Sequence, residues 1–442
     1  MPAAALPVTP TALAPATPGA AMHALLERLY PICRSLTGNG VRQTLAILRE
    51  YLPELRVLEV PSGTPALDWT VPAEWNIRDA WVKNAAGERV IDFQQHNLHV
   101  VQYSTPVSGW FSRAELDQHL FSLPEQPYLI PYRTSYYQPD WGFCLSHQQR
   151  LQLQDEYYEV CIDSTLDEGG SLTYGELVLP GACPDEVLLS CHCCHPSLAN
   201  DNLSGLVVAA FLLRELARRP RRYTYRLVVG PGTIGSIVWL SRHPDTVGLI
   251  RHGLVLTLLG GPGPFTYKQS RQGTAEIDRA AAQVLRHSGQ PHAVRPWLPY
   301  GYDERQYCSP GFNLPVGCLS RTPFGEFPEY HTSADNLQFV QPGQLAESLQ
   351  VTLSLCEALE ANRTYRNLQP YGEPQLGRRG LYKGVGGGRE GAEWQLALLW
   401  LLNLSDGQHS LLAIAEQAAL PVPLLHRAAV ALEGVGLLQP FP

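Results

Sequence analysis

The chain has 442 residues, a formal net charge of -8, 45% hydrophobic residues and 17% charged ones. One hydrophobic core rarely serves so long a chain, so we expect two or three domains of a soluble globular protein. The negative charge argues against affinity for nucleic acid or an anionic membrane, and no apolar stretch is long enough to span a bilayer. Three of the ten cysteines fall within Cys191–Cys194. This clustering does not look like the disulfide framework of a secreted protein, so we expect a reducing cytoplasm.

The first third of the chain divides into a tail, two helices and a β-rich unit. Residues 2–20 are rich in Ala, Pro and Thr and contain no Lys or Arg, which predicts a disordered tail over residues 1–21 rather than a signal peptide. Residues 22–52 indicate two helices, interrupted at Thr37–Gly40. From residue 60 to 146, short β-prone runs alternate with Pro, Gly and Trp. We expect five tryptophans to form the core of this unit: Trp69, Trp75, Trp81, Trp110 and Trp141.

Strands and helices alternate from Tyr157 to about Asn362, which predicts an α/β sheet with helices on both faces. The expected strands are Glu176–Pro180, Glu186–Ser190, Tyr225–Gly230, Gly253–Leu259 and Leu314–Ser320. The expected helices are Leu203–Arg218, Ile234–Ser241, Ala275–His287 and Pro342–Ala361.

The C-terminal segment indicates a separate small module. Residues 370–390 are rich in Gly and Arg and are typical of a linker, and three short amphipathic segments follow, as in a winged helix over residues 385–442. The candidate recognition segment, Pro421–Glu433, offers one Arg and one His, a weak electrostatic footprint for DNA. We therefore expect the module to dock on the rest of the chain or to form a homo-oligomer contact.

The segment Ser190–Gly205 concentrates the chemistry of the chain. It follows an apolar run typical of a buried strand and precedes a predicted helix, and the carboxyl end of a strand is where ligands bind in open α/β sheets. Two imidazoles, a carboxylate and a cluster of thiols meet there, and such groups suit Zn²⁺. A further histidine, His331, lies in a later polar loop. The pattern suggests a metal-dependent amide-bond hydrolase.

The segments His192–Gly205 and Tyr330–Asn336 resemble the M28 family of zinc aminopeptidases. Nearly the whole chain resembles aminopeptidase-like proteins with an inserted β-rich domain and a C-terminal winged helix, which are often encoded among polysaccharide or secondary-metabolite genes. Further matching stretches are Asp68–Pro72, Ile130–Tyr137, Trp141–Cys144 and Gly301–Gly311. The resemblance implies a mixed sheet with helices on both faces. It also implies a catalytic domain over residues 22–59 and 147–369, interrupted by the inserted domain over 60–146.

The resemblance places His192, Asp201 and His331 at metal-ligand positions. Three protein ligands leave a fourth tetrahedral place for water, as catalytic zinc requires. His195 could replace His192 as a ligand or orient a ligand from behind. Cys194 stands where an M28 enzyme carries a carboxylate, and its thiol could bind metal or simply pack.

Two metal ligands and the general base of the M28 pattern are missing. M28 enzymes carry two adjacent glutamates after the strand that corresponds to Tyr225–Gly230, whereas this chain has Gly232 in a stretch without carboxylates. An aspartate is expected after the next strand, where this chain has Gly261. We therefore expect at most one zinc per chain.

A one-zinc site needs its base from elsewhere. Asp303 and Glu304 lie in a loop that the resemblance places at the cleft, although either could instead pair with Arg305. Glu326 and Glu329 are weaker candidates, for the base or for holding a substrate amine.

Tyr302 and Tyr330 could donate to an oxyanion. The sequence leaves four functions open, the last of which is a transcription regulator built on the C-terminal module. The first is a one-zinc hydrolase, either an aminopeptidase or a deacylase, acting on a small molecule or short peptide. The second is a degenerate aminopeptidase fold that binds a ligand or partner without hydrolysis. The third is a thiol-dependent acyl transferase or hydrolase using Cys194 or Cys191 beside a histidine.

Overall fold

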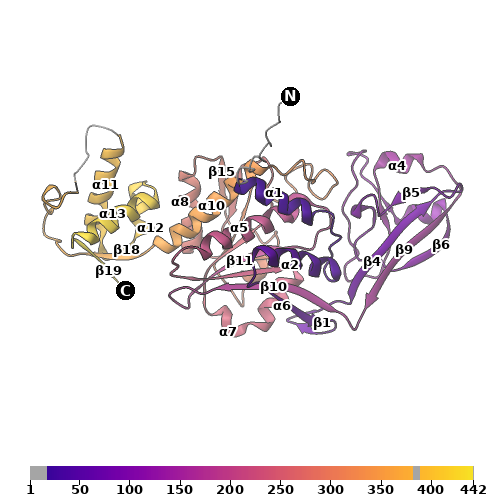
Figure 1. The fold of residues 1–442 in the computed structure, drawn as a ribbon, viewed down its shortest axis with the longest axis horizontal. Coiled ribbons are helices and arrows are strands. Elements are labelled where there is room, and N and C mark those ends of the chain that lie inside the picture. The colour runs from indigo at the N-terminus through magenta and orange to yellow at the C-terminus, as the bar shows by residue number, and fades with distance from the viewer. Residues whose placement is uncertain (1–16, 382–388, 442) are drawn as a thin grey trace, which may run out of the picture.

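The computed structural model describes residues 17–381 and 389–441 (Figure 1). An eight-stranded sheet lies in the middle of an elongated molecule, with the inserted β-rich region at one end and the C-terminal module at the other. The strand order is β1-β10-β12-β11-β13-β16-β14-β15. These strands are β1 Arg56–Pro61, β10 Ser171–Leu179, β11 Glu186–His192, β12 Thr224–Gly230, β13 Ile250–Leu256, β14 Phe265–Lys268, β15 His292–Arg295 and β16 Val316–Ser320.

The sheet is mixed, as predicted. Strands β12, β11, β13 and β16 run parallel, whereas β1 and β10 add antiparallel strands at one side and β14 pairs antiparallel with β16 at the other. Every residue of β11 and β12 is buried, which explains the apolar runs Val187–Leu189 and Leu227–Val229, since a central parallel strand is covered on both faces.

Helices cover both faces of this sheet. Val187, Leu189 and Cys191 of β11 pack in the core under α1, α2, α5, α8 and α10, whereas Leu188 points to the other core, with Trp239 of α6. The helices of this domain are α1 Pro18–Leu29, α2 Asn39–Tyr51, α5 Gly205–Ala217, α6 Ile234–Arg242, α7 Pro244–Val247, α8 Glu276–His287, α9 Glu304–Tyr307 and α10 Pro342–Ala361. The four helices predicted between residues 203 and 361 are thus confirmed.

The first helix begins earlier than expected. Thr17 accepts a hydrogen bond from the backbone N–H of Ala20, and Pro18 takes the first helical position, where its missing N–H costs nothing. The prediction of disorder up to residue 21 was therefore wrong at its end, and residues 1–16 lie outside the described residues.

The inserted region forms its own four-stranded sheet in the order β5-β4-β9-β6. Because β9 pairs with both β4 and β6, the region continues to Asp167, beyond the expected boundary at residue 146. Its elements are β2 Pro65–Ala66, β3 Trp69–Thr70, β4 Glu74–Lys83, β5 Arg89–Asp92, β6 Val107–Ser112, α3 Arg113–Leu116, β7 Leu120–Phe121, β8 Phe143–Cys144, α4 His147–Gln152 and β9 Tyr157–Asp167.

The prediction that five tryptophans form the core of this region was wrong for two of them, Trp69 and Trp110. Trp75 is buried and donates from Nε1 to the Ser104 carbonyl at 2.9 Å. Trp110, on the outward face of edge strand β6, is 63% exposed, and Trp69 is 43% exposed. The ring of Trp69 makes an edge contact with Tyr137, with 5.3 Å between ring centroids.

The C-terminal module combines three helices with a three-stranded sheet and lies against the region of the eight-stranded sheet. It begins with β17, ahead of the expected start at residue 385, because β17 pairs with β18 and β19. Helix α13 contacts α10, α12 contacts α8, and an ion pair joins Arg279 to Glu416. Part of the predicted linker, residues 382–388, lies outside the described residues. The elements are β17 Thr364–Asn367, α11 Arg389–Leu404, β18 Asp406–Ser410, α12 Leu411–Ala418, α13 Val422–Gly434 and β19 Leu438–Phe441.

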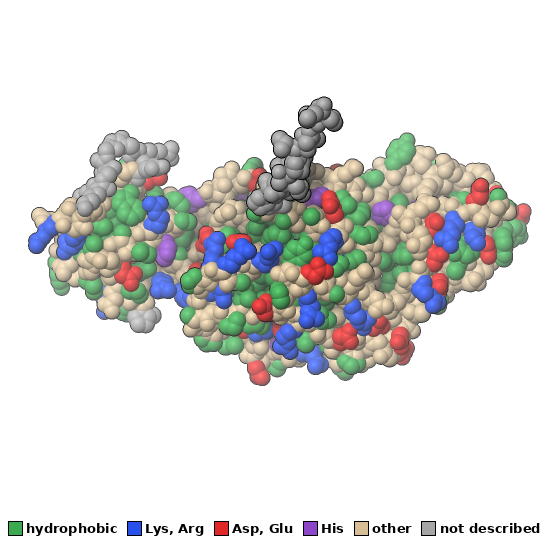
Figure 2. All heavy atoms as spheres, viewed as in Figure 1, with side chains coloured by type: hydrophobic (Ala, Val, Ile, Leu, Met, Phe, Trp, Pro, Cys, Tyr) green, Lys and Arg blue, Asp and Glu red, His purple; other side chains and the backbone are tan. Residues whose placement is uncertain are grey.

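Among the described residues, no helix is long and apolar enough to cross a membrane. On the face drawn in Figure 2, basic and acidic side chains are interspersed along the whole length of the molecule.

Candidate metal centre

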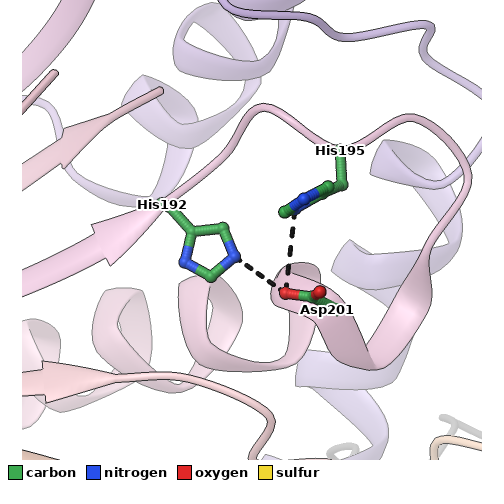
Figure 3. A group of neighbouring side chains, drawn as sticks. All are labelled: His192, His195 and Asp201. Carbon is green, nitrogen blue, oxygen red and sulfur yellow. Dashed lines mark hydrogen bonds and ion pairs between the residues drawn. The ribbon is translucent and has the colours of Figure 1, made fainter. Parts of the chain in front are cut away.

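Two histidines and an aspartate meet where β11 gives way to α5 (Figure 3). His192 is the last residue of β11, His195 lies in the following loop, and Asp201 lies in a π-helical turn, Ala199–Ser204, that leads into α5. Since β11 runs parallel to both of its neighbours, these side chains lie at the carboxyl edge of the parallel strands.

The carboxylate of Asp201 faces three imidazoles. His192 Nε2 lies 2.8 Å from Oδ1, and His195 Nδ1 lies 3.7 Å from the same oxygen. Each of these three side chains offers one ligand atom, and the atoms all lie within 4.8 Å of one another. His331 Nε2 approaches the other oxygen, Oδ2, at 3.0 Å. The structure thus brings together all four sequence-predicted ligands.

Burial and protonation suit this cluster to a metal cation. His192, His195 and Asp201 are at most 5% exposed, and His195 Nδ1 has no hydrogen-bond partner among the described residues. Burial lowers the pKa of His195 to about 3, so its imidazole is neutral. Burial raises the pKa of Asp201, but its histidine neighbours outweigh that effect and hold it well below the usual range. Neutral imidazoles with a carboxylate are the donor set that zinc takes, so the residues fit the metal.

Two residues that sequence reasoning missed hold the ligand loops in place. The Asp335 carboxylate accepts hydrogen bonds from the backbone N–H groups of Asn200 and Asp201 at 2.5 and 2.9 Å. Arg34, fully buried, donates from Nε to the His195 carbonyl at 3.0 Å. Asp335 stands in the same polar loop as His331, a signal that was available, whereas nothing in the sequence near Arg34 indicated its contact.

The ring of Tyr302 fills the space beside Gly232. A Cβ atom on Gly232 would overlap this ring, coming within 2.6 Å of Cζ and 2.8 Å of Cδ1. The same ring packs on His192, with 4.0 Å between centroids, and its hydroxyl donates to the Gly232 carbonyl at 3.2 Å. An aromatic ring therefore lies where the M28 pattern would carry a carboxylate ligand. At Gly261 a Cβ would meet Phe339 at 3.1 Å.

The cysteines near the cluster are packed, protonated thiols. Cys191 and Cys194 are each 1% exposed. Burial raises the pKa of Cys194 to about 11 and that of Cys191 well above its usual range. A nucleophilic cysteine needs a lowered pKa, so this environment gives no support to the thiol-dependent alternative.

Asp303 and Glu304, the two candidate bases, are in different environments. Asp303 is buried and accepts a hydrogen bond from Ser236 Oγ at 2.9 Å, and burial raises its pKa to about 6. Glu304 is fully buried in an ion pair with Lys268, so the expected partner Arg305 was wrong for Glu304. Asp303 keeps a proton-accepting group available, whereas Lys268 already neutralises Glu304.

Glu304 also lines a neighbouring cavity of about 340 Å³ rather than the cavity at the histidines. Glu326 lines the same cavity and pairs with Arg295 at 2.5 and 2.9 Å. Phe324 lies between this cavity and the cluster, with its ring centroid 5.7 Å from that of Tyr302.

Glu329 and Tyr330 support the loop that carries His331. The Glu329 carbonyl accepts hydrogen bonds from the backbone N–H and the hydroxyl of Thr332. Tyr330 stacks on His331, with 3.9 Å between centroids. Neither residue lines the cavity at the cluster.

The cavity at the cluster has a volume of about 260 Å³ and is lined by residues from both the region of the eight-stranded sheet and the inserted region. His195, His331 and Tyr302 form its floor. Its other lining residues are Leu36, Trp69, Tyr132, Thr134, Tyr136, Tyr137, Gly232, Thr233, Ile234 and Arg305.

The inserted region reaches this cavity through backbone pairing. The N–H of Tyr132 donates to the His331 carbonyl at 2.8 Å, and the N–H of Ser333 donates to the Ile130 carbonyl at 2.9 Å. The Tyr132 ring lies 5.0 Å from His195 and 4.9 Å from His331 between centroids. Sequence reasoning missed this contribution, because the pairing joins segments about two hundred residues apart.

Comparison with known proteins places this architecture in a family. A family model described as a domain of unknown function (DUF4910) matches residues 23–362, most of the chain. The chain belongs to this family. A winged helix-turn-helix model matches residues 363–440, which agrees with the module beginning near β17.

Relatives and solved structures connect the family to aminopeptidase-like folds. A Clostridium acetobutylicum protein, provisionally named a polysaccharide biosynthesis protein with an aminopeptidase-like domain, is 48% identical over 95% of this chain and 96% of its own length. A crystal structure from the same organism, titled as a provisional peptidase, has a TM-score of 0.90 at 46% identity and covers 96% of each chain. The zinc aminopeptidase BSAP of Bacillus subtilis shares the fold alone, with a TM-score of 0.56 at 10% identity over 76% of this chain and 93% of that one.

Proposed function

We propose that this protein is a one-zinc hydrolase that cleaves an amide bond in a small molecule or short peptide. The observation that carries the proposal is the buried cluster of His192, His195, Asp201 and His331, gathered around one carboxylate in an aminopeptidase-like fold. His192, Asp201 and His331 would hold the metal, with His195 as a fourth ligand or as their support. Bound there, zinc would polarise the scissile carbonyl and lower the pKa of a water molecule.

The residues around the cluster supply the remaining functions. Asp303 is the base of the proposal, since burial brings its pKa to about 6, close to the working range for acid–base catalysis. Burial raises the pKa of Tyr302 well above its usual range, so its phenol keeps its proton and can donate to a developing oxyanion. The buried rings around the histidines exclude water, which strengthens such charge interactions.

The naming of the Clostridium relative supports a place in the biosynthesis of a small metabolite. Every cysteine in the described residues is a free thiol, which supports the proposal of a reducing cytoplasm. The missing carboxylates at Gly232 and Gly261 favour a second candidate, a protein that binds its ligand at this site without cleaving it.

Metal analysis and turnover together test the proposal. The full chain should retain about one equivalent of zinc after dialysis and should hydrolyse at least one member of a panel of aminoacyl and N-acyl amides. His192→Ala should lose both properties. His409→Ala, a remote change in the C-terminal module, is the matched control and should lose neither. Retained zinc without turnover of any amide would favour the binding protein, and two retained equivalents would contradict the one-zinc site.

A further inference from the structure

The lining of the cavity at the cluster carries a positive charge. Among the described residues that line it, Arg305 is the only Lys, Arg, Asp or Glu. Arg305 is exposed, and no side chain in the described part of the chain forms a hydrogen bond or ion pair with its guanidinium. A guanidinium with its donors free is suited to a bidentate contact with a carboxylate or phosphate.

None of the three carboxylates near the cluster lines the cavity. Asp201 faces the imidazoles, Asp303 is buried against Ser236, and Glu304 pairs with Lys268. A substrate ammonium group entering this cavity would find no carboxylate to bind and would meet the positive charge of Arg305. Like charges brought together in a partly desolvated site cost free energy, so the cavity disfavours a free amine.

The rim of the cavity is aromatic. Trp69 and Tyr137, which come from the inserted region, are 43% and 46% exposed and make an edge contact with each other. Tyr132 and Tyr136 lie deeper, and their hydroxyls are 3.0 Å apart. Exposed aromatic rings beside a buried polar floor suit the apolar or planar face of a small ligand.

We infer that the substrate is an anionic N-acyl amide, held by its carboxylate or phosphate on Arg305 and by an apolar face on Trp69 and Tyr137. This inference rests on the proposed hydrolase and selects the deacylase over the aminopeptidase. In the cleaved bond, water adds its oxygen to the acyl carbon and a proton to the departing nitrogen, giving a carboxylic acid and an amine. The anion on Arg305 stays with the product and is not consumed.

The test compares ligands that differ in one charge. Zinc-loaded full-length protein is assayed with N-acetylphenylalanine, its neutral amide N-acetylphenylalaninamide, and phenylalaninamide, which has a free amine. N-acetylglucosamine 6-phosphate carries a phosphate in place of the carboxylate. Comparing its kcat/KM with that of N-acetylphenylalanine therefore shows whether Arg305 prefers a phosphate or a carboxylate. The anionic ligands should give the highest kcat/KM, and the free amine the lowest.

Two variants separate a binding role for Arg305 from loss of net charge. Arg305→Gln should lower kcat/KM for the preferred anion by about 10- to 100-fold, the scale of one charged hydrogen-bonded contact, and should leave the neutral amide within about twofold. Arg49→Gln removes the same charge from an exposed position on α2 and should leave kcat/KM unchanged for both substrates. Preference for phenylalaninamide, or equal losses on anionic and neutral amides in Arg305→Gln, would overturn the inference while leaving the hydrolase intact.

Direct binding keeps the inference testable if no amide is cleaved. Titration calorimetry with N-acetylphenylalanine and N-acetylphenylalaninamide should show anion-selective binding that Arg305→Gln removes and Trp69→Ala weakens. Such binding without turnover would contradict the proposed hydrolase and support the anion site. Equal binding of the charged and neutral ligands to the unmodified protein would contradict the anion site itself.

Discussion

The overlap between Gly232 and the Tyr302 ring predicts that the smallest possible side chain at residue 232 destabilises the protein. The backbone at Gly232 has no positive φ, so Gly232→Ala tests space rather than backbone conformation. The new methyl group would lie within 2.6 Å of Tyr302 Cζ, well inside van der Waals contact. The ring cannot move freely, because His192 lies on one side of it at 4.0 Å and Phe324 lies at 5.7 Å between centroids.

The expected cost has two parts. Forcing an extra methyl group into a packed site costs about 1–3 kcal/mol. Displacing the ring also breaks the hydrogen bond from Tyr302 to the Gly232 carbonyl, which contributes ~1 kcal/mol. The two parts sum to about 2–4 kcal/mol, and at roughly 2–4 °C for each kcal/mol the melting temperature should fall by roughly 4–16 °C.

The assay is thermal unfolding of the full chain beside a matched control. Gly248→Ala adds the same methyl group where no atom lies within 4 Å, and it should leave the melting temperature within about 1 °C. In a Tyr302→Ala background, Gly232→Ala should cost little, because the ring it meets is gone. If the melting temperature of Gly232→Ala equals that of the unmodified protein, the Tyr302 ring does not occupy this space, and it does not explain the missing carboxylate at residue 232.

Three further predictions concern metal, turnover and acid stability. His331→Ala should lower the retained zinc well below one equivalent, which elemental analysis would show; full retention would remove His331 from the ligand set. Asp303→Asn should keep zinc but lose about 10²- to 10⁴-fold in kcat, and unchanged turnover would move the base elsewhere. Arg42 holds the pKa of Glu74 at about 2 through two hydrogen bonds, so this pair stabilises the fold above pH 4.5 and loses that effect as the pH falls toward 2. Glu74→Gln should therefore cost about 1–3 kcal/mol near pH 7 and progressively less in acid, whereas a pH-independent difference in urea unfolding would contradict the ion pair.

The sequence predicted the fold of the eight-stranded sheet well because its signals are local. Strands β11 and β12 are buried on both faces and therefore contain the apolar runs Val187–Leu189 and Leu227–Val229. His192 ends β11 and Asp201 follows it nine positions later, so one strand and one turn fix these two side chains together. The boundary of the inserted region failed for the opposite reason. Strand β9 alternates apolar and polar residues like any half-buried strand, and nothing local indicates which sheet it joins.

The residues around the cluster could not be predicted because long-range contacts decide them. Tyr132 reaches His331 through backbone pairing, which leaves no pattern in the side chains. Glu304 and Asp303 are neighbours in sequence, yet one pairs with Lys268 and the other with Ser236, because α9 begins between them and turns the two carboxylates apart. A motif can show that carboxylates are present in a loop, but their partners decide which of them can accept a proton.

Two departures from the aminopeptidase pattern, Cys194 and Gly232, meet at the ring of Tyr302 in the structure. The thiol of Cys194, at a place where the pattern has a carboxylate, lies 3.4 Å from the N–H of Gly232 and 3.4 Å from the Tyr302 hydroxyl. Gly232 has no side chain, which leaves room for the Tyr302 ring, and the ring then covers His192. With this ring in place, a carboxylate at residue 232 would collide with it, and a charged group at residue 194 would be buried beside it without a partner. The close packing of Cys194, Gly232 and Tyr302 means that the thiol at residue 194, the missing side chain at residue 232 and the ring beside His192 are matched to one another.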